Sequence, residues 1–404
     1  MKLTATQHLF SQRSRTVLVL VALALALICT GCGSSGFWFC KSAAKSFSSQ
    51  PAGQPLPDYD ARFFREEGWT GADGDLSVAL SDEVTLWLFG DSYFSEIEDN
   101  TRTCPLCFSR NSIALQRGKD PRTAHVEYFF GKGQDGEPSA FFTPPDGHGW
   151  LWPGHGIRIQ NSLYLFLWQL VEGQDQRFLF GKSVGMWLAV VTNPDAPPHQ
   201  WSITYRKVPL ARYSEAGDDR MRFGMALVRD GDWIYVYGVD EEYKGDYPIR
   251  YLIVARVHKD HLADFDHWSF YSNGAWLSDW RQVTRGFVIA SEFSVVYQPA
   301  LHGYVAVYTE NGLSKRILLR YAPAPYGPWS DPTAVFECPE MDWNKNFVCY
   351  GAKGHPELSA APDELIVTYA TNTLDGPPDV RLYWPRFLRV TFGSSGQCSR
   401  FLIH

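Results

Sequence analysis

Beyond residue 60 the sequence consists of short runs in which apolar and polar residues alternate, separated by Gly, Pro, Asp and Asn. We find no stretch there with helical periodicity. Leu76, Val78 and Leu80 alternate along one run, and residues 85–89 form a second run after a Ser-Asp-Glu turn. An apolar period of two places one face of a strand in the core. The pattern therefore predicts a nearly all-β chain built from hairpins.

The hairpin pattern recurs, and each hairpin is followed by a third apolar run. The further hairpins pair residues 156–159 with 163–168, 223–228 with 233–237, 293–297 with 304–308, and 356–359 with 365–369. Five such units between residues 60 and 393 predict a five-bladed β-propeller, because radial repetition leaves few long exposed strand edges. Each unit is longer than the roughly 40 to 50 residues of compact propeller repeats, which leaves room for binding loops. Two β-sandwiches are the alternative, but the linker that they require near mid-chain is missing.

The first 31 residues have the features of an export signal. Basic residues precede an apolar run over residues 17–28, which is too short to span a bilayer core of roughly 30 Å. The Cys-Thr-Gly-Cys sequence that ends at Cys32 resembles a bacterial lipobox, although Cys29 stands where leucine is usual. This resemblance implies lipidation of Cys32. We expect a signal peptide over 1–31, a flexible tether over 32–59, the propeller over 60–393 and a C-terminal tail over 394–404.

Export and composition limit where the protein acts and what it binds. We expect an extracytoplasmic lipoprotein of the cell envelope that is anchored to the membrane, and a secreted or periplasmic product is the alternative. The formal net charge of −7 offers no basic surface for a phosphate backbone, so nucleic acid is not an expected partner. Aromatic residues make up 15% of the chain and favour stacking on ring-shaped ligands. We expect a monomer, and the sequence requires no cofactor.

Six cysteines remain beyond the lipobox, and in an oxidising compartment they are expected to form disulfides. They allow 15 pairings, of which the spacing favours Cys338 with Cys349 and permits Cys104 with Cys107. Cys40 can pair with Cys398 if the two ends of the domain meet. A zinc site made by Cys104, Cys107 and the later pair is the alternative.

Two motif matches lack the structural context that their chemistry needs. Residues 131–136 fit G-x-G-x-x-G, but Pro138 follows where a phosphate-binding helix would begin. Residues 181–185 fit G-x-S-x-G, but residues 186–192 read as a strand, whereas a nucleophile elbow needs a helix. We therefore do not expect Ser183 to be a catalytic nucleophile.

Asp73 and Asp91 are the strongest candidates for catalysis. Asp73 precedes the first strand of the first hairpin, and Asp91 follows the strand that returns beside it, so both carboxyls come to the same rim. Two carboxyls in one cleft can have different pKa values and serve as acid and as base or nucleophile, which is what glycoside hydrolysis requires. The alternative is that both side chains accept hydrogen bonds from backbone N–H groups in tight turns.

Several segments together resemble a family of bacterial five-bladed propellers catalogued as domains of unknown function. They are Trp69-Thr-Gly-Ala-Asp-Gly, Leu86-Trp-Leu-Phe-Gly-Asp-Ser, Arg110-Asn-Ser-Ile, Trp152-Pro-Gly-His-Gly, and Gly354-His-Pro-Glu-Leu-Ser with Tyr369-Ala-Thr-Asn. The resemblance covers roughly residues 60–393. Some relatives are endo-D-arabinanases, and the fold is similar to that of arabinanase and fructosidase hydrolases. The resemblance implies a glycoside hydrolase that cleaves a furanose-rich polysaccharide such as arabinan, with Asp73 and Asp91 as the catalytic carboxylates.

Further residues are candidates for substrate or metal binding. Glu292 begins the fourth unit and is a candidate third carboxylate that holds substrate or adjusts a pKa. Similar propellers place a histidine near a metal on their axis, which makes His355 the candidate ligand for Ca²⁺. The candidates for substrate binding are Trp150, Trp152, His155, Trp276, Trp343, His355 and Glu357. For each of these, packing within the fold is the alternative.

Two other classes of function remain open at this stage. The chain could be a carbohydrate-binding propeller without catalysis, in which aromatic loops contact sugar and the carboxylates are structural. It could also be an interaction module of the cell envelope, which would lack acids and aromatics gathered on one concave face.

Overall fold

The computed structural model describes residues 50–104, 107–134, 136–173, 181–244, 247–375 and 379–393. These residues form an all-β structure, as predicted, and the single α-helix among them is α2 (Pro57–Phe63). The predicted signal peptide, Cys32, Cys40, Cys398 and the tail lie outside the described residues. Within the described part, no helix has the length and apolar character needed to cross a membrane.

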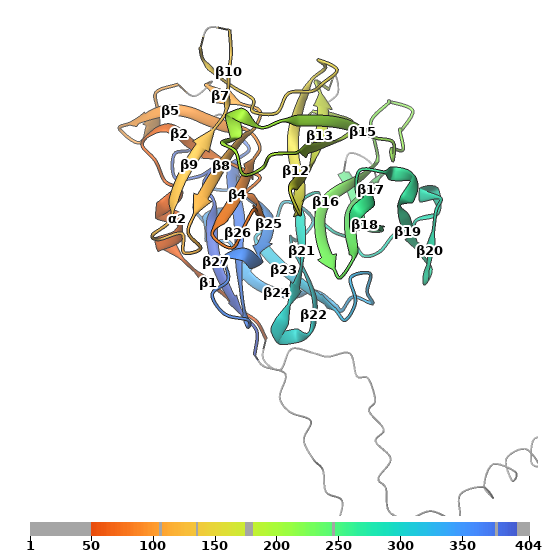
Figure 1. Ribbon diagram of the computed structural model, residues 1–404. Coiled ribbons are helices and arrows are strands. Elements are labelled where there is room, and N and C mark those ends of the chain that lie inside the picture. The colour runs from red at the N-terminus through yellow and green to blue at the C-terminus, as the bar shows by residue number, and fades with distance from the viewer. Residues whose placement is uncertain are drawn as a thin grey trace, which may run out of the picture. The chain divides into compact units, whose positions relative to one another are not determined.

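Five sheets of four or five antiparallel strands follow one another along the chain (Figure 1). The first comprises β3 (Leu76–Ala79), β4 (Val84–Phe89), β8 (Ser112–Arg117) and β9 (His125–Phe129), and the second β12 (Trp150–Ile159), β13 (Ser162–Val171), β14 (Lys182–Val191) and β15 (Ile203–Val208). The third comprises β16 (Met221–Asp230), β17 (Trp233–Lys244), β18 (Tyr247–His258), β19 (Ser269–Ser272) and β20 (Ala275–Leu277). The fourth comprises β21 (Phe293–Gln298), β22 (Gly303–Thr309), β23 (Arg316–Ala322) and β24 (Thr333–Glu337), and the fifth β25 (Phe347–His355), β26 (Glu364–Thr373), β27 (Arg386–Thr391) and β1 (Gly53–Pro55).

Smaller elements surround these sheets. A further sheet contains β2 (Glu67–Ala72), β5 (Ser92–Glu98), β6 (Thr101–Arg102) and β7 (Phe108–Ser109), and β10 (Gly131–Lys132) pairs with β11 (Pro138–Ser139). The described 3-10 turns are η2 (Pro198–Gln200), η3 (Lys259–His261), η4 (Phe265–His267), η5 (Trp280–Gln282), η6 (Pro299–Leu301), η7 (Pro339–Asp342) and η8 (Pro356–Leu358). As expected, no phosphate-binding helix follows residues 131–136, and Ser183 lies within strand β14.

The first strands of the five sheets lie beside one another. Strand β12 contacts both β3 and β16, and β21 contacts both β16 and β25. Ser77 of β3 in turn shares a hydrogen bond of 2.6 Å with His355 of β25, so the fifth sheet returns to the first. Apolar side chains such as Phe166, Phe223 and Trp268 fill the space between neighbouring sheets. The ends of the five first strands are therefore brought together although they are far apart in sequence.

The folded body includes part of the segment predicted to be a tether. Gly53, Gln54 and Pro55 of β1 pair with Val390, Arg389 and Leu388 of β27, so the N-terminal segment supplies the last strand of the fifth sheet. Helix α2 follows directly, and its Phe63 packs against Trp87 and Phe387. The pairing partner is over 300 residues away, which is why the local sequence does not reveal this strand.

Four of the five predicted hairpins coincide with pairs of neighbouring strands, and the fifth is misplaced. Residues 356–359 were expected to form its first strand, but that strand is β25, which ends at His355, and Pro356–Leu358 form η8. The register of β25 shifts between Tyr350 and Lys353, and Gly351 has a φ of +64°. This irregularity breaks the apolar alternation from which the strand would have been recognised.

Two disulfides link cysteines of the described residues. They join Cys104 to Cys107 and Cys338 to Cys349, the two pairings that the spacing permitted or favoured. The alternative of a zinc site is excluded for these four cysteines, because their sulfurs are bonded to one another.

Candidate functional site

Asp73 and Asp91 lie close together because the backbone on either side of them is held by glycines. The N–H of Gly90 donates to the carbonyl of Asp73 at 2.9 Å. A Cβ at Gly74 would lie 2.8 Å from the nitrogen of Gly90, and a Cβ at Gly90 would lie 2.5 Å from Oδ1 of Asp73. Residues other than glycine would therefore force these two segments apart. The sequences Asp73-Gly74 and Gly90-Asp91 thus position both carboxyls.

The surroundings of the Asp73 carboxyl change its pKa. Tyr350 donates its hydroxyl hydrogen to Oδ2 of Asp73 at 2.8 Å. Burial, followed by the negative charges of Glu292 and Asp91, raises the pKa of Asp73 to about 7, although Tyr350 and Lys353 act in the opposite direction. Asp73 is therefore partly protonated near neutral pH and can donate a proton.

Asp91 has partners that favour its charged form. Arg110 Nη1 donates to Oδ2 at 3.1 Å, and the indole of Trp152 donates to Oδ1 at 2.8 Å. Burial raises the pKa of Asp91, and the contacts with Arg110 and Trp152 limit that rise. The guanidinium of Arg110 also lies 4.2 Å from the ring centroid of Trp150. The structure therefore brings Trp150 and Trp152, two predicted binding residues, to the aspartate pair.

Glu292 belongs to the same group of charges. It precedes β21 and forms an ion pair of 3.3 Å with Lys353 of β25, which is buried and also donates to the carbonyl of Gly351 at 2.6 Å. Asp75 lies nearby, fully buried, and neither of its carboxyl oxygens has a hydrogen-bond partner. Burial raises the pKa of Asp75 well above its ordinary value, and the charge of Lys353 acts in the opposite direction.

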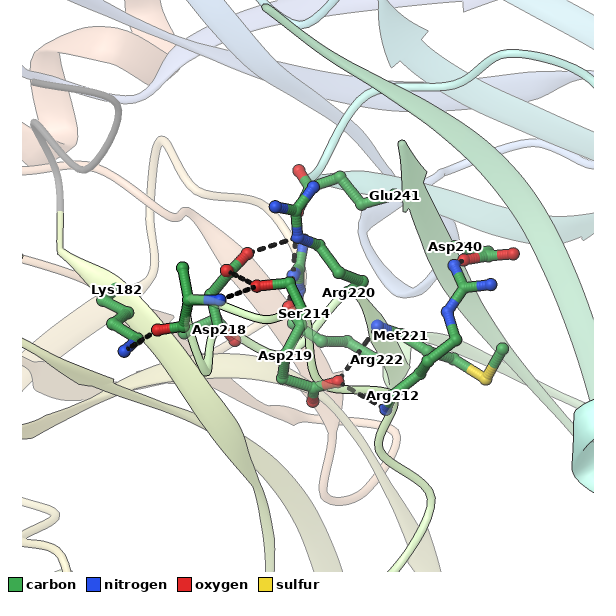
Figure 2. Close-up of polar contacts among 12 residues, drawn as sticks. Lys182, Arg212, Ser214, Asp218, Asp219, Arg220, Met221, Arg222, Asp240 and Glu241 are labelled. Atoms are coloured by element: carbon green, nitrogen blue, oxygen red, sulfur yellow. Dashed lines mark hydrogen bonds and ion pairs between the residues drawn. The ribbon is translucent and has the colours of Figure 1, made fainter. Parts of the chain in front are cut away.

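A chain of aromatic and charged side chains continues from Asp91 to the third sheet. The ring of Trp152 lies 5.8 Å from that of Trp168, and the guanidinium of Arg222 lies 4.5 Å from the Trp168 ring. Arg222 is buried and pairs with Glu241 at 3.2 Å; Figure 2 shows both residues. Although burial raises the pKa of Glu241, the charges of Arg222 and Arg250 outweigh it and the pKa is lowered.

Bulges in the first strands of three sheets determine the direction of several side chains of the candidate site. The pairing register shifts after Pro153 in β12, after Phe223 in β16 and after Tyr350 in β25. In each case the next residue is a glycine, and Trp152, Arg222 and Tyr350 lie at or just before the shift. A bulge bends a strand and redirects its side chains. The repeated glycine is a signal in the sequence that could have pointed to Arg222 and Tyr350, which the sequence analysis missed.

The predicted binding residues His155, His355 and Glu357 take part in hydrogen bonds between sheets. His155 donates from Nε2 to the carbonyl of Ser77 at 3.1 Å and accepts at Nδ1 from the N–H of Leu227 at 2.9 Å. Ser77 donates its hydroxyl hydrogen to Glu357 and therefore accepts from Nδ1 of His355. These hydrogen bonds join the first, second, third and fifth sheets. His355 is the last residue of β25, and Glu357 lies beyond it in η8 rather than in the strand predicted over residues 356–359.

The environment of the two histidines keeps them neutral. Burial lowers the pKa of His155 to about 4 and that of His355 to about 3. The second ring nitrogen of His355 lies 2.7 Å from the hydroxyl of Thr368, so both nitrogens are hydrogen-bonded. Among the described residues, the groups with metal-ligand spacing are His261, Asp264 and His267 on the surface, and Glu340 with the disulfide-bonded Cys338 and Cys349. The prediction of Ca²⁺ at His355 remains untested.

Trp276, Trp343 and Ser183 have other surroundings. Trp276 lies on β20, where Arg256 is 4.2 Å from its ring centroid. Trp343 is 48% exposed after η7 and lies near Arg381. Ser183 accepts a hydrogen bond of 2.7 Å from the indole of Trp168. This contact gives the hydroxyl of Ser183 a structural partner.

Comparison with known families identifies the chain as a member of one of them. Residues 57–392 match the family described as "Domain of unknown function (DUF5005)", and the chain belongs to that family. This result confirms the predicted membership in a family of unknown function. No curated protein matches the sequence.

Comparison with solved structures finds one protein that shares the fold and others with lower similarity. A protein from Bacteroides ovatus, named as a candidate hydrolase, superposes with a TM-score of 0.62 at 20% identity, over 83% of this chain and 89% of that one. A family 117 glycoside hydrolase from the marine bacterium Zobellia galactanivorans has a TM-score of 0.49 at 11% identity, over 86% and 91% of the two chains. A family 62 α-L-arabinofuranosidase domain from Coprinopsis cinerea has a TM-score of 0.45 at 12% identity, over 87% and 98%. The likeness to the Bacteroides protein concerns the fold alone.

Proposed function

We propose that this chain is a glycoside hydrolase whose five larger sheets are the blades of a five-bladed β-propeller, with Asp73 and Asp91 as its acid and base. One observation carries the proposal: two neighbouring aspartates, both buried, have different hydrogen-bond and charge partners. Tyr350, Glu292 and burial surround an Asp73 whose pKa is about 7, whereas Arg110 and Trp152 hold the carboxylate of Asp91. Carboxyl pairs with diverging pKa values divide the work in this way.

In the proposed reaction Asp73 donates a proton to the leaving glycosidic oxygen. Asp91 acts as base or nucleophile on the opposite side of the sugar, and the distance between the carboxyl groups in the substrate complex determines which. Glu292 adjusts the pKa of Asp73 through its charge. Trp150 and Trp152 lie beside Asp91 and offer aromatic surfaces for a sugar ring.

The substrate that we propose is a furanose-rich polysaccharide such as arabinan, which follows from the family resemblance in the sequence. We also propose that Cys32 carries the lipid anchor, so that a monomer acts at the cell envelope. Any Ca²⁺ bound at His355 would have to replace one of the two hydrogen bonds of its ring nitrogens. Labelling with a lipid precursor, compared between the unaltered chain and Cys32→Ser, tests the anchor.

The catalytic proposal is tested by Asp73→Asn and Asp91→Asn. Each variant is expected to lower kcat by about 10²- to 10⁴-fold on a polysaccharide that the unaltered chain cleaves, which is the usual contribution of one acid–base group. Asp195→Asn is the matched control, because Asp195 is exposed and pairs with Arg158 outside the site. Unchanged turnover in both site variants would contradict the proposal. Binding of glycans without product release from any of them would instead support the carbohydrate-binding alternative.

A further inference from the structure

A cavity of about 830 Å³ lies beside the third sheet, outside the group around Asp73. It forms where Met221 at the start of β16 and its pairing partner Asp240 in β17 meet the loop that contains η5. The lining residues that matter here are Arg212, Tyr213, Asp240, Trp280, Arg281 and Arg285. The cavity thus combines two aromatic side chains with three guanidinium groups.

Positive charge exceeds negative charge on the cavity wall. Asp240 is the single carboxylate among the lining residues, and it is 5% exposed. It pairs with Arg212 and also with Arg285, whose Nε donates to it at 2.6 Å. The remaining ion pairs reach residues that do not line the cavity, since Arg285 contacts Glu242 at 2.9 Å and Arg281 contacts Asp279 at 3.2 Å.

The guanidinium groups of the arginines have N–H donors that remain available to a ligand. Each guanidinium has five N–H donors, which is more than one shared carboxylate can accept. The side chains of Arg212 and Arg285 are 44% and 35% exposed, so they are open to solvent within the cavity. Burial and then the positive charge of Arg285 lower the pKa of Arg212, which shows that the two cations repel each other. A bound anion would relieve that repulsion.

The cavity is fixed by the fold. Oδ1 of Asp219 accepts hydrogen bonds of 3.0 Å from the backbone N–H groups of both Arg212 and Met221, as Figure 2 shows. Asp279 likewise accepts from the N–H of Arg281 at 3.1 Å, at the start of η5. These bonds hold the backbone on both sides of the cavity. The guanidiniums therefore project from positioned segments.

The cavity adjoins the residues that lead to the proposed catalytic pair. Met221 and Asp240 line it, and the residues that follow them in sequence are Arg222 and Glu241. Neighbouring residues of a strand point to opposite faces of the sheet. Arg222 reaches Trp168, whose ring neighbours Trp152 and hence Asp91. The cavity and the Arg222–Trp168 contact therefore lie on opposite faces of the third sheet, and a glycan that reaches both has to pass the edge of that sheet.

We propose that this cavity is a subsite for an anionic substituent, a carboxylate or sulfate group, on the glycan that the Asp73–Asp91 site cleaves. The planar guanidinium fork of arginine matches both groups by paired hydrogen bonds. Trp280 and Tyr213 contact the sugar that carries the substituent. This inference rests on the proposed function and narrows its substrate to acidic polysaccharides, for which a neutral arabinan is a poorer ligand.

Calorimetric binding to the mature chain tests the subsite without requiring turnover. The probes are an oligogalacturonate, a sulfated galactan oligosaccharide and a neutral arabino-oligosaccharide of equal length. We expect one of the acidic probes to bind at least 10-fold more tightly than the neutral one, with affinity that falls as salt rises. The tighter acidic probe identifies the substituent. Equal affinity for all three probes would overturn the inference.

Variants at the cavity supply the second part of the test. Arg212→Gln is expected to weaken binding of the preferred acidic probe by at least 10-fold and binding of the neutral probe by less than 2-fold. Arg212→Lys is expected to weaken binding of the acidic probe less than Arg212→Gln does. Because Arg212→Gln leaves the buried Asp240 with one partner fewer, Arg281→Gln, whose ion pair is exposed, serves as the second variant. Arg206→Gln on the exposed side of β15 is the matched control. Full affinity in both Arg212→Gln and Arg281→Gln would overturn the subsite.

Failure of this inference differs from failure of the proposed function. If Asp73→Asn abolishes cleavage but acidic and neutral probes bind equally, the hydrolase stands and the subsite does not. If acidic probes bind through Arg212 but Asp73→Asn and Asp91→Asn both turn over normally, the subsite stands and the catalytic proposal does not.

Discussion

Single side chains in this protein acquire their chemistry from neighbours that are distant in sequence. Asp73 is an aspartate between two small residues, and nothing local would alter its acidity. Its carboxyl receives a hydrogen bond from Tyr350 and the electrostatic influence of Glu292, both more than 200 residues away. These two contacts act on the pKa of Asp73 in opposite directions. They can therefore be separated by substitution.

If Asp73 is the proton donor, activity declines as pH rises through its pKa of about 7. The phenol of Tyr350 stabilises the ionised carboxylate, so Tyr350→Phe is expected to raise the pKa of Asp73 and move the alkaline limb of the rate profile to higher pH. Glu292→Gln removes a negative charge that opposes ionisation, and the limb is expected to move to lower pH. Profiles of kcat/KM against pH measure both shifts. Shifts in the same direction would exclude Asp73 as the titrating donor.

Among the elements, the first strands carry the site because they are irregular. Strands β12, β16 and β25 each contain a bulge with a glycine, and each presents a site residue there. In β16 the glycine is Gly224, with a φ of +97°, and a Cβ at this position would lie 2.2 Å from the ring of Phe166. The bulge thus requires a residue without a side chain, both for the backbone conformation and for packing between the second and third sheets.

Gly224→Ala is therefore expected to destabilise the protein by about 2–4 kcal/mol, which combines the cost of a left-handed residue with that of an overpacked contact. The displaced bulge should also disturb the contacts of Arg222 with Trp168 and Glu241. Gly231→Ala is a matched control, because Gly231 has a φ of +61° in the same sheet and nothing lies within 4 Å of its Cβ position. Denaturant unfolding of both variants measures the difference. If both variants lose the same free energy of unfolding, the backbone conformation alone, and not the contact with Phe166, accounts for the destabilisation.

For the whole molecule, closure between the first and last sheets decides whether the site forms. Ser77 of the first sheet bonds to His355 and Glu357 of the fifth, and its carbonyl accepts from His155 of the second. Strand β1 completes the fifth sheet from the other end of the chain. These contacts bring Asp73 of the first sheet to Tyr350 of the fifth.

Ser77→Ala is expected to lower the free energy of unfolding by about 1–3 kcal/mol, since Nδ1 of His355 and the carboxyl of Glu357 each lose the hydroxyl of Ser77 as a partner. Asp73 and Tyr350 belong to the same two sheets, so kcat should fall as well. Ser202→Ala, at an exposed position, is the control. Thermal unfolding and turnover are measured on the same samples. A Ser77→Ala protein as stable as the control would show that closure does not depend on this hydrogen-bonded group.

Alternation along the chain was sufficient to predict the all-β class and most hairpins, because neighbouring residues set the faces of a strand. Cysteine spacing favoured one of the two observed disulfides and permitted the other, because both close short loops. The same local logic placed Asp73 and Asp91 at one rim, since the two strands beside them form one hairpin. It could not find β1, the true course of β25, or the partners Tyr350, Lys353, Arg222 and Glu241. Those depend on contacts between different sheets, where burial and charge act through space, and only the tertiary structure brings such residues together.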